Sequence, residues 1–345
     1  MSVGATRPPT LGAALRRWGL RASWVAVLLL LPLAPVAAGL PPTVRYAPFL
    51  ASVVLFGFPH GAVDHLVPGR LGDVSLVRSL AVVGAVYAVL GGLYTAWWFL
   101  APVSAFVFFI LLTWAHWGQG DLYALLAFAE VEHLPSRGER ALSAVVRGGL
   151  PMLVPLVSHP GEYRRVATAL VGLFGPAESV LTLVFTETAR LAVGVGFGTV
   201  TVLALGLGLW RVRGGAARHG WAVDAGEVTL LWVYFLAVPP VLGIGLYFCL
   251  WHATRHLARL ALIDDDGARP ALAAGDLRTA LWRLARDATP MTVGGLAVVG
   301  ALFVLVPRAA TGFEGLLALY LVGIAVLTLP HVAVVTWMDL RQEVW

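Results

Sequence analysis

Apolar stretches long enough to cross a bilayer recur along this chain from residue 22 to residue 338. A helix needs about 20 apolar residues to span the hydrocarbon core. The pattern predicts such helices at residues 22–40, 47–66, 76–100, 103–127, 141–158, 189–210, 228–262 with a break at Pro239–Pro240, 290–307 and 314–338. One more apolar stretch, residues 166–186, contains Gly175 and Pro176 and either spans, re-enters or lies at the interface. We therefore expect an all-α integral membrane protein, a polytopic bundle of about eight to ten transmembrane helices.

No long polar stretch interrupts these segments, so a single polytopic membrane domain is expected. It comprises residues 22–338, preceded by a basic N-terminal segment (residues 1–21) and followed by a short C-terminal tail (residues 339–345). The composition agrees, because 59% of the residues are hydrophobic and only 12% are charged. A soluble domain carries about 25% charged residues.

The formal net charge of +5 comes from arginines in short tracts beside the apolar segments, among them Arg16, Arg211 and Arg283. Cytoplasmic loops have this pattern under the positive-inside rule. We therefore expect a multi-pass protein of the cell membrane with the lipid bilayer, and no nucleic acid, as its partner. The lone cysteine, Cys249, excludes an intramolecular disulfide and a cysteine-based metal cluster, and is expected to serve packing.

Six of the nine histidines lie inside or at the ends of apolar segments: His60, His65, His116, His252, His256 and His331. They stand in four polar islands, GFPHGAVDH (57–65), WAHWGQGD (114–121), WHATRH (251–256) and LPH (329–331). Ionisable side chains at bilayer depth are costly and usually functional, and imidazole is the commonest metal ligand. The islands therefore predict a histidine-ligated metal site inside the bundle. The remaining histidines are expected to be solvated: His133, His159 and His219.

The WHATRH island carries the strongest signal. His252 and His256 are four residues apart and share one helix face, where two imidazoles can bind one metal. The alternative is a hydrogen-bonded structural pair at a helix end. Arg255 and Arg259 lie off that face and are expected to snorkel or to bind lipid headgroups.

Two further islands supply candidate ligands together with carboxylates. His60 lies one helical turn before Asp64, and a ligating histidine commonly donates its second ring N–H to a carboxylate. His65 is rotated away from Asp64 by about 100° and is a weaker candidate. His116 is followed by Asp121, which either supports a ligand or marks a polar helix end.

The last island places His331 directly after Pro330. This histidine either binds the metal or bonds a backbone carbonyl that the proline leaves without a donor. By ligand type alone, a set of neutral imidazoles suits Fe(II), Cu, Zn or Ni.

In these islands the chain resembles the Brp/Blh family, the membrane-embedded β-carotene 15,15′-dioxygenases of bacteria and archaea that make retinal for microbial rhodopsins. The resemblance rests on PHGAVDH (59–65), HWGQGD (116–121), WHATRH (251–256) and LPHV (329–332), which follow one another in the family order. It implies a non-haem Fe(II) enzyme that adds O2 across the central double bond of β-carotene and yields two molecules of all-trans-retinal. The product would then pass to a microbial rhodopsin.

The resemblance also implies site residues. The iron ligands, and hence the catalytic residues, would be His60, His116, His252 and His256, with Asp64, His65, Asp121 and His331 orienting them. An apolar tunnel for the carotenoid would be walled by Phe56, Phe58, Trp114, Trp117, Tyr247, Phe248 and Trp251. Because many non-haem oxygenases use two histidines and a carboxylate, direct ligation by Asp64 or Asp121 is a further possibility.

Three other classes of protein also use intramembrane histidines. A transporter or proton relay would line a polar path with His and Asp, but such proteins commonly contain repeats and none is evident. A di-iron desaturase or hydroxylase uses clustered boxes with adjacent histidines, whereas this chain has one HxxxH and no HH pair. A non-catalytic, regulatory relative would have no need for intact ligands.

Overall fold

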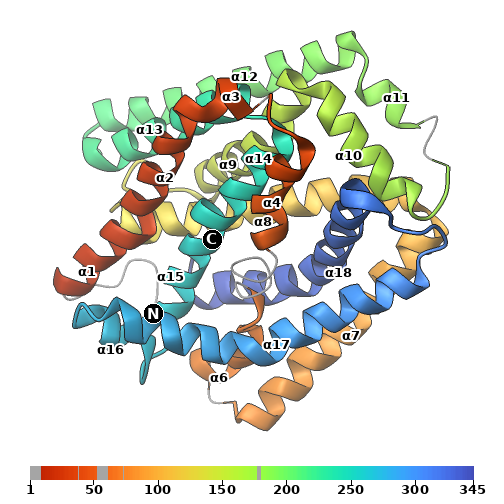
Figure 1. The fold of residues 1–345 in the computed structure, drawn as a ribbon. Helices are drawn as coiled ribbons and strands as arrows, with labels where there is room; N and C mark the ends of the chain where they lie inside the picture. Colours follow the sequence, from red (N-terminus) through yellow and green to blue (C-terminus); the bar gives the residue numbers. More distant parts are fainter. Residues whose placement is uncertain (1–8, 38, 53–60, 73, 177–179) are drawn as a thin grey trace.

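The computed structural model describes residues 9–37, 39–52, 61–72, 74–176 and 180–345, and all the regular structure in these ranges is helical (Figure 1). The α-helices are α1 (Pro9–Leu15), α2 (Ala22–Leu30), α3 (Ala34–Ala37), α4 (Pro42–Ser52), α6 (Val67–Leu71), α7 (Leu76–Leu100), α8 (Pro102–Phe128), α9 (Arg137–Ser158), α10 (Pro160–Gly172), α11 (Val180–Val184), α12 (Glu187–Arg213), α13 (Arg218–Ala237), α14 (Pro240–Tyr247), α15 (Thr254–Leu262), α16 (Ala268–Ala273), α17 (Leu277–Leu305) and α18 (Gly312–Arg341). Short 3-10 segments are η2 (Leu31–Leu33) and η4 (Asp64–Leu66), and short π segments are η1 (Arg16–Arg21) and η5 (Phe248–Ala253).

Seven helices of the described ranges are long and apolar enough to cross a membrane, which makes the chain a multi-pass membrane protein. They are Leu11–Ala37, Leu76–Leu100, Pro102–Phe128, Arg137–Ser158, Glu187–Arg213, Leu277–Leu305 and Gly312–Arg341. The all-α membrane bundle expected from the sequence is thereby confirmed.

The structure corrects one predicted segment and narrows another. Of the alternatives left open for residues 166–186, a single span is excluded, because α10 ends at Gly172 before Gly175 and Pro176. The helix predicted at residues 47–66 does not continue to its expected end, because Asp64 begins the 3-10 turn η4 instead of lying within a long helix.

Local sequence signals explain where several helices begin. Prolines occupy the first turn of α8, α10 and α14, where the missing N–H would have no helical partner. Ser136 and Glu139 form a reciprocal capping box at α9. At α17 the cap is Asp276, and hydrogen bonds from Thr279 hold the pKa of its carboxyl below the usual value.

The centre of the bundle consists of α8, α9 and α18, of which at least half is buried, while α7, α12 and α17 have few buried residues. The first two central helices cross in close contact because they meet at glycines. A Cβ at Gly118 of α8 would collide with the backbone at Ala144, and one at Gly148 of α9 would collide with that at Trp114. Small residues of this kind are what let helix backbones approach each other in membranes. The crossing holds α8 in place beside α14, η5 and α15.

Candidate metal centre

Four histidines and one aspartate converge in the interior of the bundle, and all five side chains are buried. They come from elements far apart in the sequence: Asp64 from η4, His116 from α8, His252 from η5, His256 from α15 and His331 from α18. The Nε2 atoms of His116 and His252 are 3.2 Å apart. The centroid of the His331 ring lies 4.8 Å from the centroid of the His116 ring and 5.1 Å from that of the His256 ring. We refer to these five residues as the histidine cluster.

The two histidines of the HxxxH motif, His252 and His256, lie on either side of a change in helix type. His252 belongs to the π segment η5, and α-helical geometry returns at Thr254, before His256. Extra turns of this type are frequent at functional sites, because they rotate side chains relative to an ideal helix. On the facing helix, Gly120 leaves room for the imidazole, since a Cβ there would lie 2.9 Å from Cε1 of His252.

Asp64 fixes the orientation of His331. Its Oδ2 atom accepts hydrogen bonds from Nδ1 of His331 and from the hydroxyl of Tyr87 on α7, each at 2.7 Å. Because Nδ1 then carries the proton, Nε2 of His331 presents its lone pair, as in the carboxylate–histidine pairs that support metal ligands. Helix α18 continues through Pro330, and Nδ1 of His331 bonds to the carboxylate of Asp64 and not to a backbone carbonyl.

The donor set of the cluster fits a first-row transition metal. Ligand atoms of Asp64, His256 and His331 all lie within 4.8 Å of one another. Two imidazole nitrogens that bind one ion at right angles, each at about 2.1 Å, lie about 3 Å apart, close to the spacing of the His116 and His252 nitrogens. The second carboxylate oxygen of Asp64 is buried and meets no hydrogen-bond donor among the described residues. A cation is the partner that would satisfy such an atom.

Not every residue implied by the resemblance joins the cluster. His60, Phe56 and Phe58 lie outside the described residues. Nδ1 of His65 is 3.1 Å from the carbonyl oxygen of Ala62. Asp121 instead accepts a hydrogen bond from the indole of Trp251.

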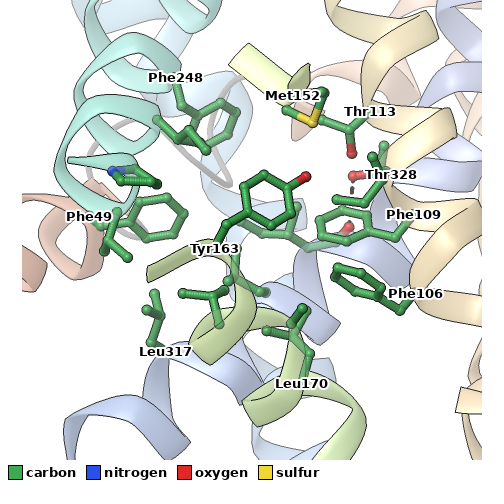
Figure 2. A pocket seen from close by; sticks show the side chains of 18 of the residues that line it. Phe49, Phe106, Phe109, Thr113, Met152, Tyr163, Leu170, Phe248, Leu317 and Thr328 are labelled. Carbon is green, nitrogen blue, oxygen red and sulfur yellow. Dashed lines mark hydrogen bonds between the residues drawn. The ribbon is translucent and has the colours of Figure 1, made fainter. Parts of the chain in front are cut away.

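Two cavities reach the cluster. The first, which we name the inner cavity, lies among α4, α8, α10, α14 and α18, and His116 lies in its wall. Figure 2 shows it surrounded by aromatic and aliphatic side chains, with Phe248 at one edge and Leu170 and Leu317 at the other. The second, the outer cavity, lies among α7, α17 and α18, with His331 in its wall. Both are mainly apolar.

Of the five described aromatic residues of the implied tunnel, two line the inner cavity and three do not. Trp117 and Phe248 line the inner cavity. Trp114 packs against Phe197 and donates to the carbonyl of Val145. Tyr247 and Trp251 are buried behind the cavity wall, where they stack on each other. The described wall is therefore formed largely by α8, α10 and α18, and its α10 and α18 residues stand outside the histidine islands, so inspection of the islands did not find them.

A second buried polar region lies behind the cluster, and we name it the ion network. It consists of Asp121, Arg147, Asp224, Glu227 and Arg255, all buried. Arg147 pairs with Asp224 at 2.6 Å and with Glu227 at 2.8 Å, and Arg255 pairs with Glu227 at 2.5 Å. The guanidinium of Arg255 also lies 3.9 Å above the ring of Trp251.

Three sequence expectations about polar residues are wrong. Arg255 and Arg259 do not snorkel or face lipid headgroups, because both are buried and ion-paired, the latter with Asp339 at 2.8 Å. His133 is not solvated, since it is buried against Asp224 at 3.0 Å. In each case a carboxylate from a distant segment offsets the cost of burying the polar side chain.

These features define a class: a polytopic helical membrane protein whose interior histidines and aspartate can hold a metal at the junction of two apolar cavities. Comparison with known proteins then identifies the family. The family described as beta-carotene 15,15'-dioxygenase matches residues 51–339, and the chain belongs to it.

Similar proteins agree with this assignment. The chain is 50% identical over 331 residues to the probable beta-carotene 15,15'-dioxygenase Blh of Halobacterium salinarum, covering 96% of this chain and 94% of the relative. It is 31% identical to the probable beta-carotene 15,15'-dioxygenase Brp of the same species, over 88% of this chain and 86% of the relative. A beta-carotene 15,15'-dioxygenase from an uncultured marine bacterium is 21% identical, over 84% of this chain and 92% of the relative. No solved structure matches the chain significantly.

Proposed function

We propose that this chain is an Fe(II)-dependent β-carotene 15,15′-dioxygenase that cleaves β-carotene with O2 into two molecules of all-trans-retinal. Membership of the family supports the reaction class. The observation that carries the proposal is that His116 belongs both to the histidine cluster and to the wall of a large apolar cavity. A wholly apolar substrate can therefore reach the candidate ligands without meeting a charged surface.

The proposed iron ligands are His60, His116, His252 and His256. His60 is included on the family resemblance alone, since it lies outside the described residues. Fe(II), when bound, supplies the redox chemistry that lets dioxygen react with an alkene. Asp64 and His331 are close enough to the other ligand atoms to orient them or to bind the metal directly.

The protein's part in the reaction is positioning. Addition of O2 to one double bond gives two aldehydes and consumes or releases no proton, so no general acid or base is required. The apolar walls exclude water and hold the polyene so that one bond lies beside the cluster, and such orientation can supply most of the selectivity. Asp121 holds Trp251 behind the cavity wall instead of acting on the substrate.

We place the enzyme in the cell membrane, where β-carotene dissolves and where a microbial rhodopsin can take up the retinal. A proton relay or transporter would require a continuous polar path, whereas the two cavities that reach the cluster are mainly apolar. A di-iron desaturase would require a second group of ligands. Among the described residues, one set of three candidate ligand atoms lies within 4.8 Å of one another, that of Asp64, His256 and His331.

Expression in a β-carotene-producing bacterium tests the proposal. The wild-type protein should bleach the orange colour and produce retinal, and His252→Ala should do neither. Cys249→Ala is the matched control, because Cys249 is buried in the same π segment and is not a candidate ligand. Unchanged carotene with stable, membrane-inserted wild-type protein would contradict the proposal, and metal analysis of that protein would then test the relay alternative.

A further inference from the structure

The inner and outer cavities share a wall at the histidine cluster. Phe248, Ile324 and Thr328 line both of them. His116 belongs to the inner cavity and His331 to the outer one, and their rings are 4.8 Å apart. The cluster therefore lies where the two apolar spaces meet, and not at the end of either.

The two cavities differ in the exposure of the residues that line them. None of the described side chains that line the inner cavity is exposed. The rim of the outer cavity includes Gly92 of α7 and Gly294 of α17, which are both exposed. Both glycines line the outer cavity, and a Cβ at either would have no atom within 4 Å, so no side chain closes the cavity at these positions of α7 and α17. We call this opening the gap.

The inner cavity has the length of a substrate half-site. Thr328 at its junction and Leu317 at its far edge both lie on α18, eleven positions apart, which corresponds to about 16 Å of helix. A rod-like substrate whose leading end reaches Leu317 would therefore place a bond well inside the polyene next to the cluster.

We infer that β-carotene enters from the bilayer through the gap at Gly92 and Gly294, and that its leading half fills the inner cavity while its trailing half stays in the outer one. The depth of the inner cavity then selects the bond that is cleaved, with Leu317 as the specificity-determining stop. This inference rests on the proposed function, because it assigns the two halves of that substrate to two spaces.

The entrance is tested by paired glycine variants in lipid vesicles that contain β-carotene. Gly294→Leu and Gly92→Leu should reduce the initial rate to a small fraction of the wild-type rate while retinal remains the product. The controls are Gly300→Leu and Gly84→Leu, on the same two helices. These glycines are also exposed with no atom within 4 Å of a Cβ, but they do not line the cavity, and the rate should not change. If the test variant and the control variant on each helix had equal initial rates, the proposed entrance would be wrong.

The stop is tested by product analysis. Leu317→Phe should keep the leading half from entering fully, so that a bond nearer its ring is cleaved and one aldehyde shorter and one longer than retinal appear. Leu317→Ala should let the substrate slide deeper and should also give unequal aldehydes, which keeps the test decisive if the larger residue prevents folding. Retinal as sole product from a folded variant would overturn the half-site assignment. Absence of retinal from the wild type would instead contradict the proposed function.

Discussion

The histidine cluster and the ion network are both buried polar regions, and they share the helical run from η5 to α15. His252 and His256 point into the cluster, whereas Arg255 between them points into the network. In the network, the guanidinium groups of Arg147 and Arg255 face the carboxylates of Asp121, Asp224 and Glu227. In the cluster, one carboxylate faces imidazoles and a phenol.

The difference shows how two sets of buried polar groups serve different purposes. A buried charge is tolerated when an opposite charge and hydrogen bonds surround it, and the network meets that condition with its own residues. The cluster contains several lone-pair donors and a carboxylate, and among the described residues Asp64 meets the neutral groups of His331 and Tyr87 and pairs with no arginine. We therefore infer that the network stabilises the fold and that the cluster is completed by a metal.

The largest effect is expected from removing a proposed ligand. His256→Ala should lower the iron retained by purified protein to background, a larger loss than the 10–100-fold that follows removal of a supporting group. Retinal formation should disappear with the iron. Thermal unfolding of the metal-free wild type and variant should be similar, because the network is intact. Full iron content in the variant would remove His256 from the ligand set.

The next largest effect should come from breaking the network. Arg147→Leu leaves Asp224 and Glu227 facing one cation fewer, and removal of one partner from a buried ion pair costs about 3–5 kcal/mol. Denaturant or thermal unfolding in detergent would measure this loss, and iron per folded molecule should stay unchanged. The double variant Arg147→Leu with Asp224→Leu should recover part of the stability. Loss of iron from folded Arg147→Leu protein would mean that the two regions are not separate.

The sequence predicted these two regions unequally well. The islands identified His116, His252, His256 and His331, because histidine inside an apolar run is a local signal. The network was missed although Asp121 and Arg255 stand within the islands. Arg255 pairs with Glu227, 28 positions away, and Arg147 with Asp224, 77 positions away. No local pattern carries that pairing, so charged residues near apolar segments were assigned to the membrane surface.

The fold shows the same difference between features set by local sequence and features set by contacts between distant segments. Long apolar runs predicted α7, α8, α12 and α18 closely, since hydrophobic length decides a membrane helix. The stretch around Asp64 was wrong as a continuous helix, because its path depends on tertiary bonds such as those from Tyr87 and His331. The walls of the two cavities also depend on helix packing, which a single sequence does not show.

A smaller effect is expected from removing the carboxylate that supports the cluster. Asp64→Asn keeps the size of the side chain but loses its charge, so metal affinity should fall about 10–100-fold. Competition with a chelator of known affinity would measure it. Asp121→Asn is the comparison, because it alters a carboxylate of the ion network. That variant should lose stability and keep its metal affinity, and the reverse result would exchange the roles of the two regions.

The smallest effect should come from the hydroxyl of Tyr87, which donates to Asp64 at 2.7 Å. Tyr87→Phe removes one hydrogen bond while keeping the ring in the outer cavity wall. Since such a bond contributes about 1 kcal/mol, metal affinity should fall about fivefold. The control is Tyr94→Phe on the same helix, where the hydroxyl donates to the carbonyl of Ala105 at 2.8 Å, away from the cluster. That variant should lose similar stability with no change in metal affinity. Equal metal affinities for the two variants would mean that the Tyr87 hydroxyl does not support metal binding and that Tyr87 serves only to line the outer cavity.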